Sequence, residues 1–561
     1  MKKEILGIEC KFAVYIPPNT ETKRPDTHLI KELVHYKDGT FERRIKTIVN
    51  YQRYFWITKE MYRNHKDKKE SESLDKVNMF RSTQSELAKN IAAQLGYKYV
   101  GKTNMRDIRK SPYVYGIDVS TGSEIKYLYK KKFPNIETTS NAVCMFDLET
   151  DVDTEEILIG SIAMENKIHT VILERILHNK VDVERRLDKL LMENLPDEKL
   201  KENLVTTYKV VKDEVTLMKE LMKEVHKWQP EIVAIWNIGF DIPLMMRRCE
   251  YHNITCEEVF CDPSIDKKYH YFYYHKDTET RVTEKGVNKA KDVQDIWNYA
   301  YGCMGFWFID AMSCYNYTRQ GESKVPSGYS LDSILNHELG SNYKKIKFEH
   351  LNTSKLIGAH YHKFMVTNHP MEYIVYNQWD VYSMVVLNQR TNDLDINMEV
   401  LGGLGTYDIF SKNPRKIIAN LHFFYLEHGY VLGAVDNSKE VEKLLGMDDW
   451  IVMLPSYRIK DRGGRILKES KKLPTNIRWF IMDLDQVSGY PSNGLAANVS
   501  KDTARREVIS MGNIDKEDFK HWNKQLLFGP VNNVGFMTNI CNFPTMFEIR
   551  EKMNNMKGKQ C

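Results

Sequence analysis

Apolar runs of strand length alternate with amphipathic stretches through the middle of the chain. The runs AVCMFDLET (142–150), ILIGSIAM (157–164) and EIVAIWNIGF (231–240) have the length and continuity of strands buried on both faces. A long charged region with helical spacing covers roughly 181–228, and DIPLMMRRCEYH (241–252) predicts another helix. Strands alternating with helices predict an α/β domain with a mixed central sheet.

The flanking parts are patterned less regularly. SELAKNIAAQLG has helical spacing and ends at Gly96, a suitable C-cap residue. YVYGIDVSTGSEIKYLY alternates in the manner of a strand and predicts a hairpin that turns at Thr121 and Gly122. The spacing over 355–393 and around 402–432 is largely helical.

Length and composition narrow the class of protein. A chain of 561 residues predicts several domains, because one hydrophobic core stops growing well below that size. Hydrophobic residues make up 42% and charged residues 28%, the balance of a folded enzyme. The net charge of +5, from 81 basic and 76 acidic side chains, excludes a histone-like tail but allows a local basic groove.

The same composition bears on the compartment. No segment is long and apolar enough to span a membrane, and the N-terminus lacks the apolar core and cleavage site of a signal peptide. Nine cysteines, an odd number, fit reduced thiols better than a disulfide framework. We therefore expect no membrane partner and a cytoplasmic location, which is the host cytoplasm if the chain is encoded by a phage.

Four residues with zinc-binding side chains fall close together in the sequence: Cys249, His252, Cys256 and Cys261. Zinc modules normally contain closely spaced cysteine pairs, and no CxxC pair is present here. The spacing fits no common zinc module, so ordinary helix and loop residues are the favoured interpretation.

Two acids end the first buried run. Asp147 and Glu149 are two residues apart in FDLET, and the period of two in a strand points both side chains to one face. Buried neighbouring carboxylates are costly unless a cation neutralises them. A strand end that exposes its acids to water remains the alternative interpretation.

Two further acids extend this pattern. Asp241 follows the turn N-x-G-F-D at the expected start of a helix, where capping alone would also explain it. Asp380 lies in the apolar helix MEYIVYNQWDVYSMVVL, and Tyr376, four residues earlier, occupies the same face. An acid on the inward side of an apolar helix needs a partner, and a metal ion held by Asp147 and Asp241 would provide one.

The chemistry that suits this set is phosphodiester hydrolysis. That reaction needs an activated water and a stabilised leaving oxygen, and two Mg²⁺-type ions about 4 Å apart serve both. Hard cations select oxygen ligands, which explains Asp and Glu rather than His or Cys, and Mn²⁺ is an alternative ion. Tyr376 is a candidate for holding the attacking water through its hydroxyl.

Three ordered motifs, FDLET, NIGFD and YNQWD, resemble those of the 3′→5′ proofreading exonuclease of family B DNA polymerases, T-even phage type. The resemblance implies a ribonuclease H-like exonuclease domain with two ions at its active site. It also implies a role for Tyr376 in orienting water, and contacts of Asn237 and Phe240 with single-stranded DNA. The metal-binding and catalytic acids implied are Asp147, Glu149, Asp241 and Asp380.

A later segment, WFIMDLDQVSGYPS (479–492), resembles motif A of the polymerase palm. The resemblance implies that Asp485 is a palm metal ligand and that Ser488, Gly489 and Tyr490 bind the incoming nucleotide. Gly489 stands where the family usually has Leu, which puts the packing of the nucleotide pocket in doubt.

The second palm aspartate and the fingers signature are not found in the chain. We therefore expect the N-terminal portion of a split or truncated polymerase, which does not polymerise alone and needs a second polypeptide that carries the C-terminal half. Primer-template DNA, a single-stranded 3′ end, dNTPs, a sliding clamp and replisome proteins are the other implied partners. A free-standing exonuclease with a vestigial palm and a non-catalytic structural replication subunit are the alternatives.

The expected fold class is multidomain α/β and α+β. It combines a ribonuclease H-like exonuclease domain around a mixed sheet with an N-terminal domain and a partial palm. The expected bounds are 1–133 for the N-terminal domain, 134–395 for the exonuclease, 396–455 for a segment returning to the N-terminal domain, 456–540 for the palm and 541–561 for the start of the fingers.

Overall fold

The computed structural model describes residues 3–66, 68–98, 100–282, 287–319, 324–346, 348–351, 356, 358–395 and 413–434. These residues lie within one compact unit, Met1–Asp436. Asp485, Ser488, Gly489 and Tyr490, and with them the expected palm and fingers, lie outside the described residues.

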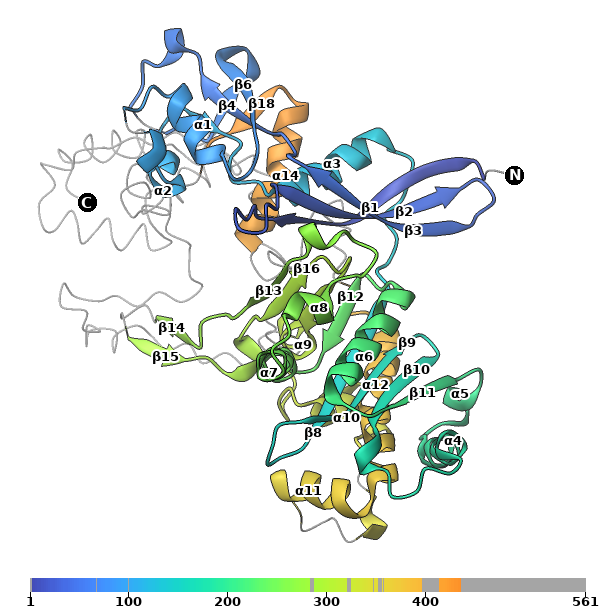
Figure 1. Cartoon of the computed structure of the whole chain (residues 1–561). Helices are drawn as coiled ribbons and strands as arrows, with labels where there is room; N and C mark the ends of the chain where they lie inside the picture. The colour runs from blue at the N-terminus through green and yellow to red at the C-terminus, as the bar shows by residue number, and fades with distance from the viewer. Residues whose placement is uncertain are drawn as a thin grey trace, which may run out of the picture. The chain divides into compact units, whose positions relative to one another are not determined.

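An eight-stranded mixed sheet forms the centre of the described chain, in the order β11-β10-β9-β8-β12-β17-β16-β13 (Figure 1). β8, β12 and β17 run parallel to one another, whereas β9 is antiparallel to both β8 and β10. The predicted mixed α/β architecture is thus confirmed. The strands are β8 (Val143–Thr150), β9 (Ile157–Met164), β10 (Lys167–Leu173), β11 (Val205–Val211), β12 (Ile232–Ile235), β13 (Phe272–His275), β16 (Tyr299–Gly302) and β17 (Trp307–Asp310).

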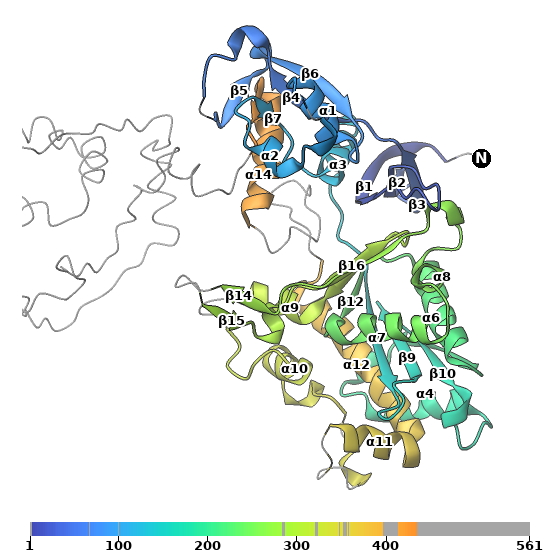
Figure 2. The same cartoon turned by 60° about the vertical axis from the view of Figure 1, so that its left-hand side comes forward.

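Helices cover both faces of this sheet (Figures 1 and 2). On β9, Gly160 faces α6 (Glu214–Trp228) so closely that a Cβ there would lie 2.6 Å from a methyl carbon of Leu221. The next residue, Ser161, faces the other way and bonds Thr170, which accepts from Gln378 of α12 (Pro370–Thr391) at 3.1 Å. Alternate side chains of one strand therefore meet α6 on one face and α12 on the other.

The remaining elements of this part connect the strands or pack around the sheet. They are α4 (Val183–Asn194), α5 (Glu198–Lys201), α7 (Ile238–Tyr251), α8 (Cys256–Phe260), the hairpin β14 (Thr280–Val282) with β15 (Asn288–Ala290), α9 (Ala311–Thr318), α10 (Leu331–Glu338) and α11 (Ala359–Asn368).

The first 130 residues form smaller sheets, ordered β1-β2-β3 and β6-β4-β7. The segment 413–434 returns to them, because β18 pairs with β5 and Phe423 of α14 stacks on Tyr127 at 4.2 Å between ring centroids. The elements are β1 (Ile5–Ile16), β2 (Thr27–Tyr36), β3 (Phe41–Val49), β4 (Arg53–Thr58), β5 (Ser71–Ser73), β6 (Val77–Ser82), α1 (Leu87–Gln94), α2 (Met105–Arg109), β7 (Val114–Tyr115), α3 (Thr121–Lys132), α14 (Asn413–Glu427) and β18 (Tyr430–Leu432).

The hairpin predicted at Thr121 and Gly122 is wrong, because those residues begin helix α3. Ser120 caps this helix by accepting a hydrogen bond from the backbone N–H of Ser123 at 3.1 Å. Alternating apolar residues suggested a strand, but Ile125 and Tyr129 also lie four apart on one helical face.

Two other helical predictions hold only in part. The region 181–228 contains α4, α5 and α6, but the edge strand β11 interrupts it. Around 402–432 the described residues form α14 and then β18, while 402–412 lies outside them.

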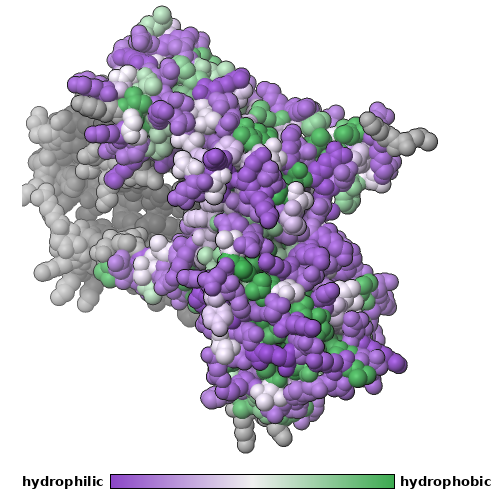
Figure 3. Space-filling view, in the orientation of Figure 1, coloured by the Kyte–Doolittle hydropathy of each residue, from purple (hydrophilic) through white to green (hydrophobic). Residues whose placement is uncertain are grey.

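The apolar side chains of the central sheet are buried in one large core between its helices. Figure 3 shows hydrophilic residues over most of the face in view, with hydrophobic ones in small separate groups. Over the described part of the chain, no helix combines the length and apolarity needed to cross a membrane.

Candidate active site

Three of the predicted acids come together at one end of the central sheet. β8 continues beyond its last pairing with β12, at Met145, so Asp147 and Glu149 lie at the carboxyl end of the parallel strands. Asp147 pairs across the sheet with Ser161 and therefore shares the face that α12 covers. One carboxylate oxygen from each of Asp147, Glu149 and Asp380 lies within 4.8 Å of the others, and the described residues contain no second such group.

Asp241, the fourth predicted acid, is close to the triad but not part of it. It lies in the first turn of α7, immediately after β12, and is only 5% exposed. Burial, followed by the charge of Glu149, raises the pKa of its carboxyl to about 8. The structure therefore groups three acids as possible ligands of one ion, with Asp241 beside them.

Lys345 and Tyr376 surround Asp380. The Lys345 ammonium donates to Asp380 Oδ2 at 2.6 Å and to the Tyr376 hydroxyl at 3.2 Å, so Tyr376 and Asp380 share one helix face, as predicted. Burial raises the pKa of Asp380 to about 6, and the charge of Lys345 opposes that rise. Asp380 Oδ1 is buried and has no hydrogen-bond partner among the described residues.

The triad suits a hard divalent cation. Its donors are carboxylate oxygens only, which such ions prefer, and Asp380 Oδ1 is a buried acceptor that a cation would satisfy. Burial and the nearby charge of Asp241 hold the pKa of Asp147 well above its usual range. The cluster thus carries an electrostatic cost that a bound cation would offset.

Neutral groups hold the other two acids. Asn377 Nδ2 donates to Asp147 Oδ2 at 2.7 Å, and the Tyr373 hydroxyl donates to Glu149 Oε2. His362, from α11, lies 3.4 Å from that same oxygen through Nδ1, and this hydrogen bond is the main cause that raises the pKa of His362.

Sequence reasoning missed Lys345, His362, Tyr373 and Asn377. The helical spacing of Tyr373 and Asn377 relative to Tyr376 and Asp380 is a usable indication, because α12 presents them to the same sheet face. The sequence around Lys345 and His362 contains no pattern that indicates a site residue. Both lie outside the predicted motifs, and the fold places them beside the acids.

Asn237 and Phe240 line a cavity of about 960 Å³ along α7, the helix that carries Asp241. Phe240 is 51% exposed although it is a large aromatic residue, and Pro243 and Met246 extend the apolar wall along α7. Asp310, which sequence reasoning also missed as a site residue, borders this cavity. It accepts hydrogen bonds from the N–H groups of Ser313 at 2.7 Å and Ile238 at 3.2 Å, and burial raises its pKa to about 7.

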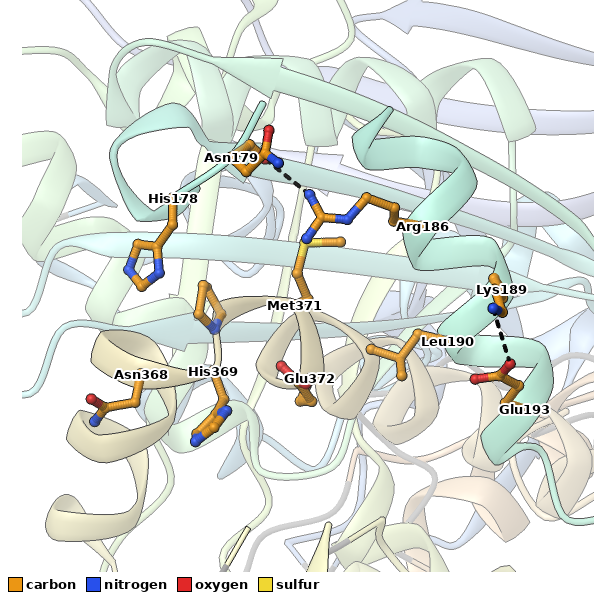
Figure 4. A pocket seen from close by; sticks show the side chains of 11 residues that line it. His178, Asn179, Arg186, Lys189, Leu190, Glu193, Asn368, His369, Met371 and Glu372 are labelled. Carbon is orange, nitrogen blue, oxygen red and sulfur yellow. Dashed lines mark hydrogen bonds and ion pairs between the residues drawn. The ribbon is translucent and has the colours of Figure 1, made fainter. Parts of the chain in front are cut away.

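A second cavity, of about 410 Å³, lies between α4 and the junction of α11 with α12 (Figure 4). Arg186 and Lys189 line it together with Glu193 and Glu372, so opposite charges are balanced around it. Lys189 is also within 3.8 Å of Glu193. This charge balance offers no selective attraction for an anion.

The zinc interpretation gains no support. Cys249, His252, Cys256 and Cys261 do not assemble into a ligand group among the described residues. His252 Nε2 instead bonds Glu214 at 2.6 Å, and the Cys261 thiol donates to the Tyr271 carbonyl at 3.5 Å.

Neither a protein-family model nor a curated protein sequence matches the chain. The resemblance to family B polymerases therefore rests on the motif residues alone. Functional inference for the described part of the chain depends on the geometry of the acids and their neighbours.

The metal-free protein is expected to lose stability as the pH rises from about 6.5 to about 8. Asp241, with its pKa raised to about 8 from 3.8, stays protonated in the folded chain below that value, whereas the unfolded chain ionises it earlier. Stability from such a raised pKa is fully present below 3.8 and is lost as the pH rises through the folded value. Buried His28 and His422 have pKa values lowered to about 4 and act below this window.

Calorimetric melting in EDTA across this window measures the effect. Mg²⁺ should flatten the decline, and Asp241→Asn should decline less than the native chain. A melting temperature that stays constant or rises with pH in EDTA contradicts the expectation.

Proposed function

We propose that this chain is a divalent-metal-dependent 3′→5′ exonuclease that acts on single-stranded DNA. The observation that carries the proposal is the buried triad of Asp147, Glu149 and Asp380 with its unpartnered carboxylate oxygen. The alternative explanation, a strand end that exposes its acids to water, does not fit the burial of these side chains. Glu149 and Asp380 are both less than 8% exposed, and Asp147 is half-buried.

The arrangement of the sheet supports a ribonuclease H-like core. Five neighbouring strands run in the order β10-β9-β8-β12-β17, and β9 alone is antiparallel to its neighbours. The acids lie on the central strand β8 and on α12, which packs over it. Ligand sites in open α/β sheets form at the carboxyl ends of the strands, as this one does.

Asp147, Glu149 and Asp380 would hold the metal, with Asp241 beside them. We propose two ions of the Mg²⁺ class, with Mn²⁺ as an alternative. When bound, they would supply Lewis-acid stabilisation of the phosphoryl oxygens. The Tyr376 hydroxyl accepts from Lys345 and is also hydrogen-bonded to Asp380, so it is placed to contact a water beside that carboxylate. Lys345 adds a positive charge where a phosphate would approach.

The cavity beside Phe240 supports an unpaired strand as the substrate. An exposed aromatic ring offers a stacking surface that tolerates any base, and Asn237 adds hydrogen-bonding groups next to it. A paired base at a recessed 3′ end is held by its partner strand and by stacking on its neighbour, so it must unpair before it can use this surface.

The proposal is tested on a 5′-labelled single-stranded oligonucleotide with Mg²⁺. We expect products that shorten progressively from the 3′ end, a slower reaction on a fully paired end, and no reaction in EDTA. Products of internal cleavage, or release of the 5′ label as the first product, contradict an exonuclease of this polarity.

A broader proposal keeps the polymerase resemblance. The segment 479–492 favours the N-terminal portion of a family B DNA polymerase over a free-standing exonuclease, because its Asp485 and the turn after it match a palm motif. This segment lies outside the described residues, so the broader proposal rests on the sequence alone.

A further inference from the structure

Two residues outside the predicted motifs hold Glu149. Its Oε2 accepts from the Tyr373 hydroxyl of α12 and lies 3.4 Å from His362 Nδ1 of α11. The same Nδ1 is 2.8 Å from the Tyr373 oxygen, so the three side chains form one connected group.

We propose that Tyr373 and His362 are positioning residues that restrain Glu149 through Oε2 and leave only Oε1 for a metal ion. A carboxylate restrained in this way acts as a one-oxygen ligand, which favours Mg²⁺ over the larger Ca²⁺. This inference rests on the proposed metal-dependent function, because it assigns the ion selectivity of that same site.

Tyr373 is suited to this role because it cannot turn away. It has no exposed surface, and its ring stacks on that of Tyr376 with centroids 6.1 Å apart and planes 14° from parallel. Its position on a helix of 22 residues packed on β8 and β9 fixes the backbone as well. A hydroxyl on such a ring points at a fixed place.

His362 connects α11 to the acids. In this helix of ten residues only Met365 is buried, and His362 is half-buried with its ring toward Tyr373 and Glu149. When Nδ1 carries a proton, His362 donates to the Tyr373 oxygen, and the phenolic proton is then directed at Glu149. α11 therefore contributes to the site through an inward-facing side chain.

The consequence for ion choice follows from coordination chemistry. Mg²⁺ demands near-ideal octahedral geometry at short distances, whereas Ca²⁺ accepts six to eight oxygens and often takes both oxygens of one carboxylate. Freeing Oε2 allows Glu149 to offer both oxygens, which suits Ca²⁺ and disturbs Mg²⁺. Loss of a group that holds a metal ligand typically costs about 10–100-fold in affinity.

The test is calorimetric titration of the full chain, without DNA, with Mg²⁺ and separately with Ca²⁺. For Tyr373→Phe we expect the Kd for Mg²⁺ to rise by about 10–100-fold and the Kd for Ca²⁺ to change by less than about threefold. His362→Asn, on a helix in which only Met365 is buried, should shift the ratio in the same direction by a smaller factor. It serves as the second variant if Tyr373→Phe folds poorly.

Matched controls separate this role from general packing. Tyr382→Phe removes another hydroxyl hydrogen bond of α12, made to the Leu200 carbonyl at 3.3 Å. His360→Asn changes an exposed histidine of α11. Both should keep the Mg²⁺ to Ca²⁺ ratio of the native chain.

Equal losses for both ions in Tyr373→Phe and His362→Asn, or no change in either variant, overturn the inference. A native chain that binds Mg²⁺ selectively but digests no DNA overturns the proposed exonuclease and leaves the positioning role standing if the ratio shifts. A native chain that binds neither ion overturns both.

Discussion

Asp147→Ala is expected to reduce Mg²⁺-dependent digestion of single-stranded DNA by about 10³-fold or more. Asp147 supplies one of the three grouped carboxylates, and it is the one bonded to Asn377 at 2.7 Å. Metal ions supply several kcal/mol of transition-state stabilisation in phosphoryl chemistry, and about 4 kcal/mol corresponds to that factor. Single-turnover digestion of a 5′-labelled oligonucleotide at saturating enzyme measures the chemical step directly.

Asp153→Ala is the matched control for charge. This acid lies six residues further along the same segment, is exposed, and pairs with the exposed Lys363. Its removal should leave the digestion rate within about twofold, because surface pairs contribute little. Equal rates for Asp147→Ala and the native chain would show that the activity, if present, arises elsewhere.

The acids were predictable from sequence because their pattern is local. A period of two puts Asp147 and Glu149 on one strand face, and a spacing of four puts Tyr376 and Asp380 on one helix face. Buried strands that alternate with helices then place both elements in one α/β domain, and that architecture is confirmed.

The rest of the site depends on contacts between distant segments. Lys345 precedes Asp380 by 35 residues and reaches it from the segment after α10, and His362 reaches Glu149 from α11. No periodicity within one element encodes such meetings. The failed hairpin at Thr121 has a different cause, since the alternation there also fits a helix and the Ser120 cap decides between the two.

Lys345→Met is expected to destabilise the metal-free protein at pH 8 by about 3 kcal/mol. Its ammonium lies 2.6 Å from Asp380 Oδ2, whose side chain is 5% exposed, so its removal leaves a buried carboxylate without a counter-charge. Partial exposure of Lys345, 27% for its side chain, places the effect at the low end for a broken buried pair. In a compact unit of the size of Met1–Asp436 that loss lowers the melting temperature by about 3–4 °C.

Mg²⁺ should restore most of this loss, because a bound cation replaces the missing charge beside Asp380. Lys363→Met is the control, because Lys363 pairs with Asp153 in a contact where both side chains are more than 60% exposed. Its melting temperature should stay within about 1 °C of the native value. A loss in Lys345→Met that is the same with and without Mg²⁺ shows that the lysine stem acts by packing. No loss at all contradicts the expectation, because it shows that Asp380 stays neutral in the variant at pH 8 and needs no counter-charge. Lys345 thus links the stability of the metal-free protein to metal binding, because its positive charge stabilises the same carboxylates that a bound metal ion would neutralise.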